Sequence, residues 1–398
     1  MARTETDRCP GVLAVHQAAD GGLARVRVPG GVLSRHQLDV LRLASADLGD
    51  GRLELTSRGN VQIRGLDPAG PRALSDRLYT AGLLPSVPHE RVRNILASPL
   101  SGLDSESRYD VMPVAAALDQ ALCARPALAD LPGRFLFALD DGRGDLAQAQ
   151  ADVYVRALDE STALLTVGAT PGLRAAWAEV PGLMLAAAEA FLVERDQEWR
   201  IAELPGGADR ILARLSGAVA DSPASRIGPA PADPLAPPQG TARAELLAPQ
   251  SWVDGAGPAS GVIEAGVHGS ALVVTVPLGS LTQEQAAAVA ECAEEVRLTP
   301  WRSVVVPAGT QGLLERVGLV TEPGSVWEGV SACAGRPGCA KALADVRADA
   351  QHLALQLRQD TARRLHVSGC ERRCGKPADG FVDVVAVAGG YLVDGERM

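Results

Sequence analysis

Apolar and polar positions follow the same order at two places in the chain and predict the same local structure at each. The segment "VPGGVLSRHQ" at 28–37 aligns with "VPLGSLTQEQ" at 276–285. Each copy begins in a valine-rich run that predicts a strand, which Pro and Gly end. Ser34 or Thr282, with a glutamine three residues later, then forms a capping box that begins a helix. The chain therefore contains an internal duplication.

The duplication continues into the next strand pair. "ELTSRGNVQIRG" at 54–65 matches "RLTPWRSVVVPAG" at 297–309 if one residue is inserted, and this alignment places Arg58 against Arg302. The period is much longer than that of a solenoid repeat. We therefore interpret the two copies as β-α-β half-units that pair into one pseudo-symmetric layer.

The region between the copies alternates strand-like and helical patterns. "GRFLFALDDGRGDLAQAQADVYVRAL" at 133–158 and "TALLTVGAT" after it predict strands, and "RAAWAEVPGLMLAAAEAFLVERD" at 174–196 predicts a helix. An α/β domain is expected here. Its "DDGRGD" segment at 140–145 lacks the terminal glutamate of a calcium loop, so we predict a hairpin turn there.

Composition and charge narrow the class of protein. The 398 residues are 46% apolar and 22% charged, with a formal charge of -10, which is typical of a globular chain and argues against a dominant nucleic-acid surface. The start has no apolar signal region, and no run approaches the ~18 apolar residues of a membrane span. We expect a cytoplasmic protein without a membrane or nucleic-acid partner, in a compartment that keeps thiols reduced.

The seven cysteines fall into two kinds. Cys9, Cys123 and Cys292 are isolated and are expected to be small buried apolar residues. The other four form two close pairs in "ACAGRPGCAKA" and "SGCERRCGKP", namely Cys333, Cys339, Cys370 and Cys374.

A helix and a strand separate the two cysteine pairs and are predicted to bring them together. Leu343, Val346, Leu353 and Leu357 recur at helical spacing, and "LHVSG" reads as a strand. Four thiolates from two loops bind either zinc or an iron-sulfur cluster, and plain burial is a third alternative. The wide gaps favour a 4Fe-4S cluster, and the glycines beside the second pair would admit the cluster sulfides.

The cysteine pattern "GCxxxCG", the duplicated half-units, "LTSRGNVQ" and "RVRNILASPLSG" together resemble the sulfite and nitrite reductase ferredoxin-like superfamily. Within it, "CPGVLAVHQAADGGLARVRVPGG" and "LPGRFLFALDDGRGD" look most like the precorrin-3B synthase family. The resemblance implies an α+β fold in which duplicated ferredoxin-like half-domains pack with α/β nitrite/sulfite reductase-type domains. The expected order is a half-domain at 1–75, an α/β domain at 76–220, a Pro/Ala-rich linker at 221–242, a second half-domain at 243–320 and a cluster-binding domain at 321–398.

The resemblance also implies an activity. Members of the family are monooxygenases of aerobic cobalamin synthesis that hydroxylate precorrin-3A between rings A and D and close the ring A acetate into a lactone. They take O2 and electrons that originate from NADH. No Gly-x-Gly-x-x-Gly element follows a strand in this chain, so a separate reductase is the expected electron-donating partner.

Family motifs place a substrate-binding arginine at Arg58 and another at Arg93, before Asn94. The Lys-x-Lys pair of the reductases falls on Arg134 and Leu136, and a leucine cannot supply protons to a reducible anion. Guanidinium groups suit the carboxylate rim of a tetrapyrrole. The arginines considered for this role are Arg58, Arg64, Arg91, Arg93, Arg134, Arg302, Arg372 and Arg373.

Two questions stay open in the sequence. The family resemblance implies that a mononuclear non-haem iron binds oxygen, and His16, His89 and His366 are the candidate ligands. The sequence contains no evident His-His-carboxylate grouping for such an iron. The alternatives to a monooxygenase are a sirohaem-dependent sulfite or nitrite reductase, which Leu136 disfavours, and an iron-sulfur electron-transfer or tetrapyrrole-binding subunit.

Overall fold

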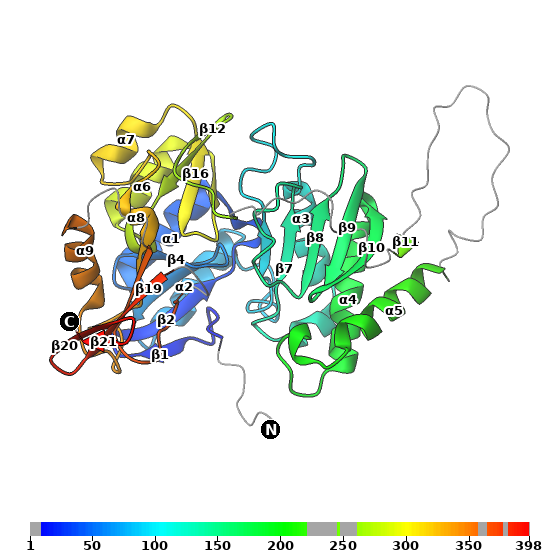
Figure 1. The fold of residues 1–398 in the computed structure, drawn as a ribbon, viewed down its shortest axis with the longest axis horizontal. Coiled ribbons are helices and arrows are strands. Elements are labelled where there is room, and N and C mark those ends of the chain that lie inside the picture. The colour runs from blue at the N-terminus through cyan, green and yellow to red at the C-terminus, as the bar shows by residue number, and fades with distance from the viewer. Residues whose placement is uncertain (1–8, 221–244, 247–260, 357–363, 377–380, 398) are drawn as a thin grey trace. The chain divides into compact units, whose positions relative to one another are not determined.

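The computed structural model describes residues 9–220, 245–246, 261–356, 364–376 and 381–397 (Figure 1). The fold is α+β and divides into two compact units. Unit 1 comprises Met1–Asp7 and Arg91–Val262, and unit 2 comprises Arg8–Glu90 and Ile263–Met398. Each unit brings its own core and its own sheets, and they are described separately below.

Two five-stranded sheets in unit 2 carry the duplication. Sheet A has the order β1-β2-β5-β4-β14, and sheet B has the order β12-β13-β16-β15-β3. The strands of sheet A are β1 (His16–Ala18), β2 (Gly21–Val26), β4 (Leu53–Leu55), β5 (Val61–Leu66) and β14 (Ser280–Leu281); those of sheet B are β3 (Val32–Ser34), β12 (Gly266–His268), β13 (Ala271–Thr275), β15 (Glu295–Leu298) and β16 (Ser303–Pro307). The helices of these half-domains are α1 (Arg35–Leu48), α2 (Gly70–Thr80), α6 (Gln283–Cys292) and α7 (Gln311–Arg316).

The two half-domains exchange one short strand each. β3 leaves the first copy to pair with β15 of sheet B, and β14 leaves the second copy to pair with β4 of sheet A. Both predicted capping boxes follow these strands: Ser34 Oγ accepts from Gln37 N, and Thr282 Oγ1 accepts from Gln285 N, each at 3.1 Å. The predicted pseudo-symmetric layer is therefore built by reciprocal exchange.

The one-residue insertion in the predicted alignment is wrong. In both copies a threonine hydroxyl closes the turn before the last strand: Thr56 Oγ1 accepts from Asn60 N, and Thr299 Oγ1 accepts from Ser303 N. Counted from the threonine, the fourth residue of each turn has a positive φ, which is 61° at Gly59 and 62° at Arg302. Arg302 therefore corresponds to Gly59, because backbone geometry aligns the turns without a gap.

One continuous apolar core lies in the two half-domains. It contains buried side chains from both sheets and from α1, α2, α6 and α7, among them Val26, Leu41, Ile63, Val274 and Val289. These residues alternate along the strands with side chains of the opposite face, as a half-buried strand requires. In sheet A the other face carries polar side chains such as Arg25 and Gln62, whereas in sheet B it carries the buried Val273 and Val305.

Sheet D completes unit 2, with the order β17-β18-β19-β20-β21. Its strands are β17 (Val330–Ala332), β18 (Arg364–Ser368), β19 (Phe381–Val387), β20 (Gly390–Val393) and β21 (Glu396–Arg397), and the helices beside it are α8 (Val326–Gly329) and α9 (Val346–Gln356). The predicted strand at "LHVSG" is β18. The predicted helix is shorter than its periodic pattern, since Leu343 precedes α9 and Leu357 lies outside the described residues.

Unit 1 is built on the six-stranded sheet C, with the order β11-β10-β9-β8-β7-β6. Its strands are β6 (Ile95–Ala97), β7 (Phe137–Asp140), β8 (Val153–Ala157), β9 (Thr162–Val167), β10 (Thr170–Ala176) and β11 (Glu245–Leu246), and its helices are α3 (Met112–Cys123), α4 (Val180–Glu194) and α5 (Gly207–Ala220). Side chains of all three helices share one core with the sheet.

Two local predictions in unit 1 are wrong. The "DDGRGD" segment is no hairpin turn, because β7 and β8 on either side of it run parallel. Such a connection must cross over, which leaves room for a loop of special shape. The predicted helix at 174–196 begins only at Val180, because residues through Ala176 complete β10 by pairing with β9.

The predicted domain boundaries differ from the units. The boundary between residues 75 and 76 falls inside α2, and the nearest division between the units follows Glu90. The Pro/Ala-rich linker lies outside the described residues, and the predicted domains at 243–320 and 321–398 fall mostly in unit 2. Among the helices that the structure describes, none has the length and apolar character needed to cross a bilayer.

The first copy depends on a close backbone approach at Gly31. Its φ is 73°, and a Cβ atom there would overlap the carbonyl oxygen of Leu298 in sheet B. We expect Gly31→Ala to lower the free energy of unfolding of unit 2 by about 3–5 kcal/mol, because it adds a backbone clash to an unfavourable φ. Denaturant unfolding followed by circular dichroism measures the loss.

Gly51→Ala is the matched control for this prediction. Gly51 has a similar φ of 77°, but nothing lies within 4 Å of a Cβ atom placed there. Only the conformational cost of about 1–2 kcal/mol should then appear. Equal losses in the two variants would show that the approach to Leu298 contributes nothing.

Candidate metal centre and anion-binding face

The four grouped cysteines lie on two loops at one edge of sheet D. β17 and β18 pair in parallel, so their carboxyl ends meet there, with Cys333 directly after β17 and Cys370 shortly after β18. Backbone bonds join the loops: Cys333 N donates to Val367 O at 3.0 Å, and Gly369 N donates to Cys333 Sγ at 3.2 Å. N–H donation to a thiolate sulfur is one of the interactions that tune cluster sulfurs.

The four thiol groups also interact electrostatically with one another. Burial, followed by the charges of Cys333 and Cys370, raises the pKa of Cys374, and Cys339 contributes in the same direction. The first three sulfurs are half-buried and Cys374 is exposed. Thiols that destabilise one another's ionised forms gain most from a cation that all can share. The arrangement therefore fits a metal group held by all four.

The spacing of the sulfur atoms favours a cluster over a single zinc ion. Among the described residues, no three of these sulfurs lie within 4.8 Å of one another. Two thiolates on one zinc ion are at most about 4.6 Å apart, since each Zn–S bond is about 2.3 Å. A 4Fe-4S cube is a larger body with a metal at each corner, so it accepts wider separations.

Packing of the two cysteine loops explains the glycine at position 369, whereas the sequence prediction was room for a cluster sulfide. A Cβ atom on Gly369 would lie 2.7 Å from Ala342 Cβ, and Leu343 N donates to Gly369 O at 2.8 Å. Close packing of the two cysteine loops against each other thus requires a glycine here, whether or not a sulfide approaches it.

Two arginines tie the cysteine loops and α9 to sheet A. Arg64 on β5 pairs with Asp20 at 2.9 Å and donates to Gly338 O, in the first cysteine loop, at 2.7 Å. Arg347 on α9 pairs with Glu54 on β4 at 2.6 Å. Arg64 is one of the arginines considered for tetrapyrrole binding, and in the structure its guanidinium contacts Asp20 and the first cysteine loop.

The face of sheet A opposite the core carries a group of arginines that sequence reasoning missed. Arg25 donates to Gln62 Oε1 across the β2–β5 pair, and Arg27 follows on the same face because strand side chains alternate. Burial, and then the charge of Arg25, lowers the pKa of Arg27 to about 9, and Arg58 contributes in the same direction. The sequence signal that could have revealed this group is the alternation of arginine and valine in "ARVRV" at 24–28.

Arg58 therefore lies close enough to Arg27 for the two charges to interact. It is half-buried on the turn between β4 and β5, with its backbone N–H held by Thr56 Oγ1. Three guanidinium groups on one sheet face create an electrostatic field that an anion with several carboxylates would neutralise.

Arg302, the other predicted arginine in unit 2, lies beside the second cysteine loop. A Cβ atom on Gly375 would be 3.4 Å from Arg302 Nη2. Burial, and then the charge of Arg347, lowers the pKa of Arg302. Arg302 is half-buried, and a carboxylate bound beside it would offset the neighbouring Arg347 charge, so the position agrees with a role in binding carboxylates near the cysteines.

The predicted site residues of unit 1 have other partners. Arg93 is buried and forms a two-bond ion pair with Asp119, with both distances at 2.7 Å. Asn94 is also buried, and its side-chain amide donates to Arg91 O and Gly133 O. Substrate binding by these residues stays a prediction.

Arg134 and Leu136 face different surroundings although only one residue separates them. Arg134 is exposed, with its guanidinium 5.0 Å from the ring centre of Trp199. Leu136 is 2% exposed and packs in a small apolar cluster with Leu96, Ala138 and Leu146. Position 136 therefore presents no titratable group to any ligand.

The three candidate histidines do not gather. His16 is exposed on β1, His89 Nδ1 bonds Ser86 Oγ at 2.7 Å, and His366 Nδ1 bonds Ser331 Oγ at 2.9 Å. Burial and the nearby Arg302 charge lower the pKa of His366 to about 4, so it is neutral at pH 7. Within the described part of the chain, no grouping of these histidines with carboxylates has the geometry of a mononuclear iron site.

Comparison with known proteins agrees with this architecture. Residues 16–79 match the nitrite/sulfite reductase ferredoxin-like half domain. A precorrin-3B synthase from Sinorhizobium sp. is 26% identical, with 98% of this chain and 83% of the relative covered. A ferredoxin–nitrite reductase from Synechococcus elongatus is 28% identical, with coverages of 94% and 78%.

A solved structure shows the same fold. The NirA protein of Mycobacterium tuberculosis superposes with a TM-score of 0.68 at 21% identity, with 94% of this chain and 73% of that protein covered. The predicted fold class, duplicated ferredoxin-like half-domains within a nitrite/sulfite reductase architecture, is confirmed.

The cysteine geometry makes a direct prediction. Because a 4Fe-4S cluster needs a ligand for each iron, Cys374→Ser should remove most of the bound iron and sulfide and bleach the broad cluster absorption. Iron and acid-labile sulfide per chain, measured after anaerobic purification, give the result.

Cys123→Ser is the control for a cysteine outside the group. Cys123 ends α3 and packs against the core of unit 1, so this variant should retain its iron. Equal loss of iron from both variants would remove Cys374 from the ligand set.

Proposed function

We propose that this chain, an oxidoreductase with the nitrite/sulfite reductase fold, is a precorrin-3B synthase-like monooxygenase of aerobic cobalamin synthesis. Its substrate would be precorrin-3A, and its cofactor a 4Fe-4S cluster on Cys333, Cys339, Cys370 and Cys374. The near full-length similarity to a precorrin-3B synthase supports the proposal. The single observation that carries the choice of an oxygenase is the buried, apolar position 136.

The arginine face of sheet A would bind the substrate. Precorrin-3A carries acetate and propionate groups around its rim, and planar guanidinium groups form paired hydrogen bonds with such carboxylates. Arg25, Arg27 and Arg58 form one positive area, and Arg302 forms another beside the cysteine loop. Carboxylates at different points of the rim would bind the two areas and so orient the ring.

The cluster, when bound, would supply electrons one at a time from an external reductase. Hydroxylation inserts one oxygen atom of O2 into a substrate bond and reduces the other to water, which consumes two electrons and two protons. NADH is the ultimate source through the separate reductase. The ring A acetate then closes onto the oxidised macrocycle as a lactone.

Leu136 distinguishes this chemistry from anion reduction. Reduction of sulfite or nitrite needs several protons at the bound anion, and a charged or titratable side chain is the usual source. Leu136 packs against Leu96 and Leu146 and can neither attract an anion nor donate a proton. A sirohaem-dependent reductase is the second candidate, because a ferredoxin–nitrite reductase matches this chain over a similar length.

An isotope experiment tests the proposed reaction. The anaerobically purified protein is mixed with precorrin-3A, an NADH-dependent reductase and ¹⁸O-labelled O2, and the product is analysed by mass spectrometry. We expect one labelled oxygen atom in the new hydroxyl group, and no consumption of sulfite or nitrite by the same preparation. A product labelled only from H₂¹⁸O, or rapid sulfite reduction, would contradict the proposal.

Arg58→Ala tests the binding face. Loss of one charge-assisted contact costs about 1.5–3 kcal/mol, so the affinity for precorrin-3A should fall roughly ten- to a hundredfold with the cluster spectrum unchanged. Arg72→Ala is the matched control, since Arg72 is an exposed arginine on α2, the helix that packs on the core side of sheet A. Anaerobic equilibrium dialysis gives both affinities; unchanged binding in Arg58→Ala would move the site elsewhere.

A further inference from the structure

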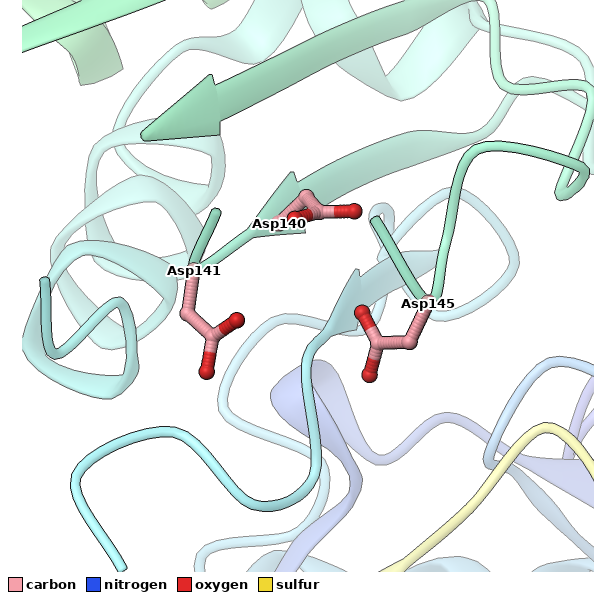
Figure 2. Close-up of side chains that lie close together, drawn as sticks. All are labelled: Asp140, Asp141 and Asp145. Carbon is pink, nitrogen blue, oxygen red and sulfur yellow. The ribbon is translucent and has the colours of Figure 1, made fainter. Parts of the chain in front are cut away.

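Three aspartates meet in unit 1 on the loop that follows β7, in the segment predicted as a hairpin turn. Asp140 ends β7, and Asp141 and Asp145 follow in "DDGRGD". All three are buried, with exposures of 0%, 0% and 8%. Figure 2 shows their carboxyl groups directed toward a common region. They belong neither to the cysteine group nor to the arginine face, both of which lie in unit 2.

The distances within this aspartate cluster suit a hard cation. One carboxylate oxygen from each residue lies within 4.8 Å of the others. Two ligands of one ion can be separated by at most twice the metal–oxygen distance, which is about 4.8 Å for Ca²⁺ and about 4.2 Å for Mg²⁺. The separation therefore falls within the limit for Ca²⁺ as the loop stands.

The hydrogen bonds leave one oxygen without a partner. Asp140 accepts from Gly142 N and Gly144 N on Oδ1, and from Leu146 N and Tyr154 Oη on Oδ2. Asp145 Oδ1 accepts from Ser98 Oγ at 2.6 Å. Within the described residues, Asp145 Oδ2 has no hydrogen-bond partner although its side chain is more than nine-tenths buried.

An unsatisfied buried carboxylate oxygen is costly and calls for a ligand. Figure 2 shows the Asp145 carboxyl group directed toward the region that the other two carboxyl groups share, so a ligand in that region would supply the missing partner.

The charges around the cluster are also unbalanced. Arg143 pairs with Asp141 at 2.8 Å and with Asp104 at 2.7 Å, so a single cation neutralises two carboxylates. Among the described residues, the hydrogen bonds to the Asp140 and Asp145 carboxylates come from neutral donors.

We propose that Asp140, Asp141 and Asp145 bind a divalent cation of the calcium class in unit 1. Three carboxylates without nitrogen or sulfur ligands select hard cations over zinc or iron. The loop lacks the terminal glutamate of an EF-hand, so water would complete the coordination. The ion would fix the crossover loop between the parallel strands β7 and β8, and its effect would appear as stability of unit 1.

Thermal unfolding of the full chain tests the proposal with the metal alone as ligand. After treatment with a chelator, the protein is titrated with Ca²⁺ and, in parallel, with Mg²⁺. A hundredfold excess over Kd should raise the Tm of unit 1 by roughly 5 °C, because only the folded state binds. Mg²⁺ should require a higher concentration for the same shift.

The Asp145→Asn variant distinguishes a bound metal ion from a protonated carboxyl group at this position. Asparagine keeps an acceptor for Ser98 but loses the charge, so the variant should fold and lose the Ca²⁺-dependent shift. Asp159→Asn is the matched control, since Asp159 is an exposed carboxylate in the same unit and should leave the shift intact. The proposal would be overturned if the Tm of the wild-type protein responded to neither ion and Asp145→Asn were at least as stable as the wild type. That result would assign a protonated carboxyl group to position 145.

Metal binding can also be measured without unfolding the protein. Tyr154 donates to Asp140 Oδ2 at 2.8 Å, so Tb³⁺ bound in the cluster should luminesce when tyrosine is excited, and Ca²⁺ should displace it. Luminescence that is the same in wild type and Asp145→Asn would also contradict the assignment.

Discussion

Alternation of arginine and valine along β2 forces sheet A to have one apolar face and one charged face. Val26 and its neighbours on β5 pack into the shared core, and this leaves Arg25 and Arg27 no position except the opposite face. Charges on a largely covered face are costly without counter-charges. A carboxylate-rich ligand on this face would add counter-charges of that kind.

The same face explains why the cysteine loops occupy their position. Arg64, which pairs with Asp20 within sheet A, donates to Gly338 O in the first cysteine loop, and Arg347 on α9 pairs with Glu54 of sheet A. One set of interactions thus orients the cysteine group relative to the arginines, within a single compact unit. A ligand bound on the arginine face would then lie at a fixed position relative to an electron donor at the cysteines.

Local patterns predicted much of this fold. The capping boxes at Ser34 and Thr282 and the strand β18 each depend on short-range signals, and the structure contains them. Long-range pairing was harder to predict. The parallel β7–β8 pair, the strand exchange and the Arg93–Asp119 ion pair join residues whose partners are not evident from neighbouring positions. The gap-free match of Gly59 to Arg302 was also hidden, since an arginine rarely adopts a positive φ.

The central claim is that the tetrapyrrole is a substrate of this chain and not its resident haem. An absorption and Mössbauer spectrum of the anaerobically purified, ⁵⁷Fe-labelled protein tests it most directly. The account predicts the signature of a 4Fe-4S cluster as the iron chromophore, with no chlorin bands and no sirohaem in an acid-acetone extract. Stoichiometric sirohaem, with its iron coupled to the cluster, would contradict the account and identify a reductase.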